Sequence, residues 1–125
     1  MAKIISSTNC GNSPKMTFLK EFNIAFAKNN LDFIIENVTD EIVWNIIGDR
    51  KIEGREDFMD ELKKMKSEKT TELFIDQILS HGKTGASNGI IKRQNGKKYA
   101  FSNFYVFQNT KSTQLKSITS YVIEI

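Results

Sequence analysis

Hydrophobic residues recur at helical spacing in three segments of the first half of the chain. The first segment begins at Ser13-Pro14, where serine can cap free backbone N–H groups and proline fits the first helical position. It ends at Asn29-Asn30. The second segment spans residues 31–38, and the third spans about residues 55–66, with acids early and lysines late, as the helix dipole favours. The pattern predicts three helices.

From Thr70 onward the hydrophobic period changes to two. Four strands are predicted, at residues 71–80, 84–93, 97–108 and 114–125, and one earlier strand at residues 42–47. Because the connections between the four late strands are short and hairpin-like, we expect an antiparallel meander. Strands of this length must curve, and Gly85 and Gly89 are candidate bends. The fold class is therefore α+β.

The domain organisation follows from the same pattern. Residues 1–12 are rich in Ser, Thr, Asn and Gly without periodicity, and we expect a flexible N-terminal tail there. Residues 13–125 contain no linker and no internal repeat, so they form a single domain of ordinary size.

Charge and cysteine content narrow the class of protein. The net charge is +3, and the visible basic cluster (Lys92, Arg93, Lys97 and Lys98) flanks an Asn-Gly turn. We interpret this cluster as a solvated hairpin end, so we expect no nucleic-acid partner. The single cysteine, Cys10, excludes an internal disulfide. No segment approaches the length of a membrane span, and we expect a cytoplasmic protein without a membrane partner.

Two motifs carry a family resemblance. Thr-Asp-Glu-Ile-Val-Trp-Asn-Ile-Ile-Gly at residues 39–48 and Ile-Glu-Gly-Arg-Glu-Asp-Phe at residues 52–58 resemble the signature of SnoaL-like domains, in the nuclear transport factor 2 (NTF2)-like, ketosteroid isomerase-like superfamily. The resemblance implies a cone, with three N-terminal helices on a strongly curved, mainly antiparallel sheet around an apolar cavity. It also implies a homodimer through the outer sheet face. In the last strands, apolar residues occupy both the odd and the even positions. This pattern agrees with a sheet that is covered on both faces.

The same resemblance tests one chemistry. The general base of ketosteroid isomerases falls on Asn45 of this chain, and their protonated aspartate falls on Asn103. The helix tyrosine of those enzymes falls near Glu21 or Phe22, where this chain has none. An amide cannot usefully accept a proton. We therefore expect no acid/base chemistry of that type, and a cavity whose polar lining is amide rather than acid.

The leading hypothesis is a binding pocket for a small apolar or mildly polar molecule. Asn45 and Asn103 would donate hydrogen bonds to a carbonyl or hydroxyl group, with Asn88 and Ser120 as weaker candidates. Trp44 is predicted to point away from the pocket, into the core. Alternatively, the helix phenylalanines simply fill the core and the asparagines are structural. The predicted apolar walls are Phe18, Phe22, Phe26, Ile90, Tyr105, Ile118 and Val122.

Two other readings remain open. One is an enzyme of the cyclase, dehydratase or isomerase type with an unidentified base, for which Asp76 and His81 are the least poor choices. The other is a protein-interaction module without a pocket. With one histidine and one cysteine, no metal site is expected, and no Gly-rich loop indicates a nucleotide cofactor. We assign no catalytic residue and no cofactor.

Overall fold

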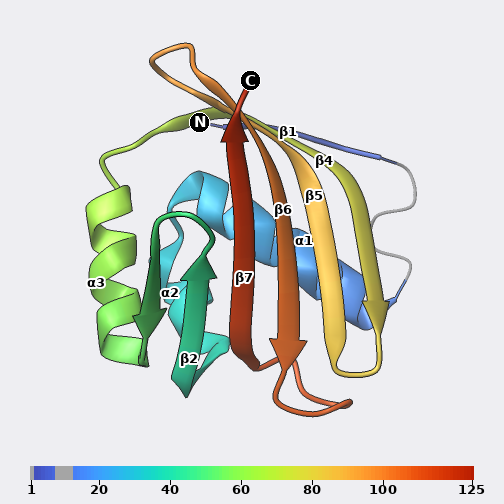
Figure 1. Ribbon diagram of the computed structural model, residues 1–125. Helices are drawn as coiled ribbons and strands as arrows, with labels where there is room; N and C mark the ends of the chain where they lie inside the picture. Colours follow the sequence, from blue (N-terminus) through green and yellow to red (C-terminus); the bar gives the residue numbers. More distant parts are fainter. Residues whose placement is uncertain (1, 8–12) are drawn as a thin grey trace.

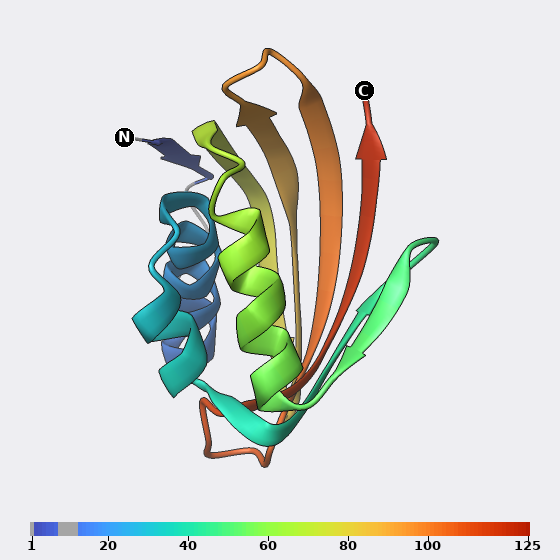
Figure 2. The ribbon, with the colours of Figure 1, turned by 90° about the vertical axis from the view of Figure 1, so that its left-hand side faces the viewer.

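The computed structural model describes residues 2–7 and 13–125. In this part of the chain, three helices cover one face of a seven-stranded, mostly antiparallel sheet (Figures 1 and 2). The helices are α1 (Pro14–Lys28), α2 (Leu31–Glu36) and α3 (Arg55–Met65). The strands are β1 (Lys3–Ser6), β2 (Val38–Ile46), β3 (Arg50–Glu53), β4 (Thr70–His81), β5 (Thr84–Arg93), β6 (Lys98–Phe107) and β7 (Leu115–Glu124).

The four long strands β4 to β7 form the antiparallel meander that the period-two pattern predicts. The strand order across the sheet is β1-β4-β5-β6-β7-β2-β3. Two of the pairings, β1 with β4 and β2 with β7, are parallel. The predicted α+β class is therefore confirmed for the described residues.

The ends of α1 follow the local sequence. The Ser13 hydroxyl accepts a hydrogen bond from the Met16 amide (3.2 Å), which satisfies one free donor of the first turn. Asn29 ends the helix in the left-handed conformation, with a φ of 58°. Between these caps, the face of α1 that carries Leu19 and Phe22 is buried against the sheet. The predicted helix is thus confirmed at both ends.

The sheet bends around α1 at one identifiable position (Figure 2). Asp76 is an extra residue in β4, since Ile75 pairs with Gly89 and Gln77 pairs with Asn88. A Cβ atom on Gly89 would lie 1.9 Å from the carbonyl oxygen of Phe74, closer than any side chain tolerates. Gly89 is therefore required where the two backbones approach, as the predicted bend implies.

Three local predictions are wrong. Lys3–Ser6 form an edge strand against β4 instead of a tail, because the Ile4-Ile5 pair gains a sheet partner; residues 8–12 lie outside the described residues. Val38 begins β2 instead of ending the second helix, and the strand starts before residue 42, because Val38 already pairs with β7 across an irregular register. Strand β3 was not predicted, since its sequence is mostly charged.

The lengths of the described helices bear on whether any of them could cross a membrane. The longest, α1, has 15 residues, and none of the described helices is long and apolar enough to cross a membrane.

Candidate functional site

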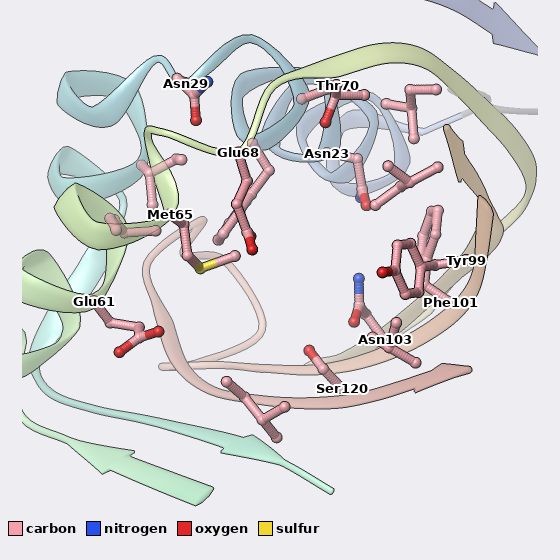
Figure 3. Close-up of a pocket in the computed structure, with 18 of the residues that line it drawn as sticks. Asn23, Asn29, Glu61, Met65, Glu68, Thr70, Tyr99, Phe101, Asn103 and Ser120 are labelled. Atoms are coloured by element: carbon pink, nitrogen blue, oxygen red, sulfur yellow. The ribbon is translucent and has the colours of Figure 1, made fainter. Parts of the chain in front are cut away.

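A cavity of about 920 Å³ lies between the helices and the concave face of the sheet (Figure 3). Helices α1 and α3 and strands β2, β6 and β7 contribute most of its wall. Aromatic and aliphatic side chains supply most of the lining surface. Amides, hydroxyls and seven charged side chains are placed among them, the charged ones being Asp49, Arg50, Glu61, Lys64, Glu68, Lys69 and Arg93. The residues used below are Phe22, Asn23, Phe26, Trp44, Arg50, Glu61, Glu68, Phe101, Asn103, Tyr105, Ile118, Ser120 and Val122.

Six of the ten predicted site residues line this cavity. They are Phe22, Phe26, Asn103, Tyr105, Ile118 and Val122. Phe18 does not line it; its ring packs in the core, 5.9 Å from that of Phe107. Asn88 and Ile90 also do not, because the alternating partners Ser87, Gly89 and Ile91 take the inner face of β5. Placing these three residues in the cavity was therefore wrong.

The orientation of β2 is the main correction. Trp44 and Ile46 line the cavity, so Asn45 between them points to the opposite face of the strand. Trp44 is only 6% exposed, with its ring edge-on to Phe26 and Phe58. The larger apolar side chain occupies the buried face because its burial stabilises the fold more than burial of an amide. The prediction that Asn45 faces the cavity and Trp44 points away is wrong.

A closed set of hydrogen bonds surrounds the Tyr105 hydroxyl. The Asn23 amide nitrogen donates to the Leu19 carbonyl (2.7 Å) and to the Tyr105 oxygen (3.0 Å). The Ser87 hydroxyl donates to the Asn23 side-chain oxygen (3.4 Å) and lies 2.7 Å from the Tyr105 oxygen. Because Ser87 has one proton, already donated, Tyr105 donates to Ser87. The tyrosine proton is thus used inside the protein.

Burial raises the pKa of the Tyr105 hydroxyl, and hydrogen bonds with Ser87, Asn23 and Asn103 offset only part of that rise. The phenol therefore stays neutral at physiological pH. Asn23 and Ser87 were missed as members of this network. The available signal was weak, since Asn23 lies on the side of α1 that carries the charged residues in the sequence pattern.

Ser120 and Trp44 form a second polar contact in the wall. The Trp44 indole nitrogen donates to the Ser120 hydroxyl oxygen at 2.9 Å. Ser120 is 5% exposed and stands directly opposite Asn103 on the neighbouring strand. Both side chains project toward the cavity (Figure 3). Ser120, the weaker candidate, therefore lies beside Asn103 in the cavity wall.

Three acids line the cavity, contrary to the amide-only expectation: Asp49, Glu61 and Glu68. Glu61 on α3 is 8% exposed, and its carboxylate forms an ion pair with Arg50 of β3. Glu68, which is exposed, also contributes to the lining. Figure 3 shows Glu61 on the side of the cavity away from Asn103 and Ser120, and the Glu68 carboxylate directed into the cavity. Glu61 is one of the early acids of the third predicted helix, and it is buried because Arg50 pairs with it at the packed face.

The two residues suggested as possible bases are elsewhere. Asp76 is the bulged residue of β4, and His81 is the exposed last residue of that strand; neither lines the cavity. Among the described residues, no group of three or more His, Cys, Asp or Glu side chains is arranged to hold a metal ion.

Comparison with known proteins finds similarity in structure. No protein-family model and no curated protein matches the sequence. An NTF2-like protein of unknown function from Cytophaga hutchinsonii is 25% identical, with a TM-score of 0.66 over 86% of this chain and 97% of that chain. A protein from Shewanella denitrificans designated a SnoaL-like polyketide cyclase is 12% identical, with a TM-score of 0.74 over 89% and 92% of the two chains.

An LEH-like epoxide hydrolase from M. tuberculosis also matches, at 16% identity and a TM-score of 0.69, over 87% of this chain and 82% of that chain. The activities given for these structures differ, and one has none assigned. Their likeness therefore establishes how the chain is folded and leaves its chemistry to be argued from the side chains.

Proposed function

From the NTF2-like fold of this chain, which SnoaL-like domains share, we propose that the protein binds a small, mainly apolar molecule inside the sheet. The observation that carries this proposal is the cavity of about 920 Å³, whose wall is mostly apolar in surface. Small-molecule sites are typically concave, mostly apolar and roughly 300–1,000 Å³ in volume. Protein interiors otherwise pack densely, so a void of this size has a use.

The polar groups of the wall define how such a molecule is held. Asn103 offers an amide that can bond a carbonyl or hydroxyl group of the ligand. Tyr105 contributes its ring, since its hydroxyl is engaged with Asn23 and Ser87. Asn45 no longer belongs to this scheme because it faces away. The absence of an acid at position 103 also argues against isomerase chemistry of the ketosteroid type.

A cavity-blocking variant tests the proposal. Val122 lines the cavity but is half-exposed, so Val122→Trp narrows the space without overpacking the core. Ile123→Trp adds a ring of the same kind on the opposite face of β7 and serves as the control. In a thermal-shift screen of apolar small molecules, hits should stabilise the wild type and Ile123→Trp but not Val122→Trp. Hits that stabilise all three proteins alike would contradict binding in the cavity.

Glu61 supports a second candidate function, an enzyme of the cyclase, dehydratase or isomerase type. It is a buried carboxylate in the cavity wall, which such a reaction needs as a base. Its ion pair with Arg50 holds the carboxylate in place. If the protein turns over a bound molecule, Glu61→Gln should reduce the rate by about 10²–10⁴-fold while binding persists. An unchanged rate would exclude Glu61 as the base.

We also propose that the protein forms a homodimer through the outer face of the sheet. Leu79, Phe104, Tyr121 and Ile123 are exposed there, and the rings of Phe104 and Tyr121 meet edge-on at 5.9 Å. Contiguous apolar patches of this kind mark interaction sites. Light scattering at micromolar concentration should give twice the chain mass for the wild type and the chain mass for Phe104→Asp. A monomeric wild type would refute the dimer.

A further inference from the structure

Ser120 has a hydroxyl whose direction is set by its neighbour. The indole nitrogen of Trp44 can only donate, so the Ser120 oxygen must accept that 2.9 Å hydrogen bond. The hydroxyl proton of Ser120 consequently points elsewhere. Within residues 2–7 and 13–125, the Trp44 contact is the hydrogen bond that this hydroxyl makes. A buried hydroxyl donor beside a cavity is costly unless something accepts from it.

Asn103 stands next to this donor. Residues 103 and 120 are directly opposite on antiparallel strands, so their Cβ atoms are about 4.5–5.5 Å apart. Figure 3 shows the Asn103 amide nitrogen directed into the cavity and the Ser120 hydroxyl on the same part of the wall. The Asn103 amide has two N–H donors, so one can bond Tyr105 while an oxygen atom between the two side chains accepts from the other and from Ser120.

We propose that Asn103 and Ser120 together form a two-donor site for the oxygen of a neutral carbonyl compound, with Trp44 as the residue that positions the Ser120 hydroxyl. This rests on the proposed small-molecule binding and names the class of molecule: a ketone, ester or amide with an apolar body. Trp44 acts through Ser120 by occupying one of its lone pairs.

The charges around the cavity define this class. A carboxylate ligand would need a cation beside Asn103 and Ser120. Of the cations in the lining, Arg50 is paired with Glu61, Arg93 donates to Thr70, and Lys64 and Lys69 are exposed to solvent. A hydrocarbon would leave both donors unpaired. An alcohol accepts as a carbonyl does but brings a proton of its own that needs an acceptor. A neutral carbonyl oxygen satisfies both donors without either cost.

Three probes with the same ring system test the assignment. They are 2-acetylnaphthalene (a ketone), 2-ethylnaphthalene (which lacks the oxygen) and 2-naphthoate (which is charged), with dissociation constants measured by calorimetry. The wild type should bind the ketone more tightly than either of the others. Ser120→Ala should weaken ketone binding by roughly 2- to 10-fold, the cost of one lost hydrogen bond, and change binding of 2-ethylnaphthalene by less than about 2-fold.

Ser117→Ala is the matched control, because it makes the same change on the same strand but on the outer face. It should leave all three affinities unchanged. The carbonyl stretching band of bound 2-acetylnaphthalene gives a second readout. It should lie at lower frequency in the wild type and in Ser117→Ala than in Ser120→Ala, because hydrogen bonds weaken the C=O bond.

A double-mutant cycle tests the positioning role of Trp44. Trp44→Phe should weaken ketone binding and raise the carbonyl frequency when Ser120 is present, yet cause no additional ketone-specific change in the Ser120→Ala background. Additive effects in the cycle would show that Trp44 acts only by shaping the cavity and would remove its assigned role.

The remaining outcomes separate the two proposals. If ketone and hydrocarbon bind equally well and Ser120→Ala affects neither selectively, the two-donor site is wrong while small-molecule binding stands. If 2-naphthoate binds most tightly, the neutral class is wrong. If none of the three probes binds the wild type, both the site and the proposed function are contradicted for molecules of this size.

Discussion

The two faces of the sheet carry the same kind of residue but bury it to different degrees. Tyr105 and Phe104 are neighbours in β6, and both are large and aromatic. Tyr105 points inward and is 2% exposed, whereas Phe104 points outward and is 51% exposed. The helices of this chain cover only the inner face (Figure 2). Apolar residues on both faces of a strand therefore do not reveal which face is buried. The layer of helices that covers one face decides which residues become core.

The largest difference in stability should come from replacing one phenylalanine by alanine on each side of the sheet. Phe22→Ala removes a fully buried ring from the inner layer and should lower the free energy of unfolding by about 3–5 kcal/mol. Phe104→Ala should change the unfolding free energy of the monomer by no more than about 0.5 kcal/mol. Urea denaturation of both variants, at a concentration where the chain is monomeric, measures the difference. Equal losses would mean that the outer face is as well packed as the inner one.

A smaller effect should follow from removing one hydroxyl on each face. Tyr105→Phe leaves the Asn23 amide and the Ser87 hydroxyl each short of a partner, which should cost about 1–3 kcal/mol. Tyr121→Phe removes an exposed hydroxyl and should cost less than about 0.5 kcal/mol. The unfolding free energy near pH 7 is the quantity to compare. If Tyr105→Phe left the unfolding free energy unchanged, the buried network would contribute nothing to stability.

The smallest effect concerns pH. Because burial raises the folded-state pKa of Tyr105, the unfolded chain loses the tyrosine proton first as the pH rises. The stability that the neutral phenol contributes is therefore complete below the unfolded pKa of about 10 and is lost at higher pH. The difference in unfolding free energy between wild type and Tyr105→Phe should shrink between about pH 9 and 11. A difference that stays constant from about pH 8 to about pH 11 would contradict the assigned cause.

The late strands could be predicted closely from sequence because each hairpin is local. For β5, the alternation of residues and the turns on either side predict both ends, and the structure agrees. The caps of α1 are equally local, since Ser13 and Asn29 act within one turn. Strand β3 could not be predicted in this way, because its charged residues are held by pairing with β2 rather than by their own propensity.

The site was predicted in part, and its errors have one cause. The resemblance to ketosteroid isomerases marked Asn103 and strand alternation marked Ser120, and both lie inward because β6 and β7 keep a regular register there. Asn45 and Trp44 were exchanged because a shift of one residue reverses every side chain of a strand. For β2 the register depends on a partner, β7, that lies about seventy residues later in the chain. Glu61 was misplaced for a related reason, since Arg50 reaches it from β3.

By itself, the sequence determined the number of helices, the antiparallel meander and the bend at Gly89, because these depend on capping, turn residues and contacts between neighbouring strands. Only the tertiary structure decided which face of β2 looks inward, that the Trp44 indole donates to the Ser120 hydroxyl, and that Glu61 joins the cavity wall. Each of these depends on partners distant in the chain, and their mutual orientation is set when the helices cover one face of the sheet.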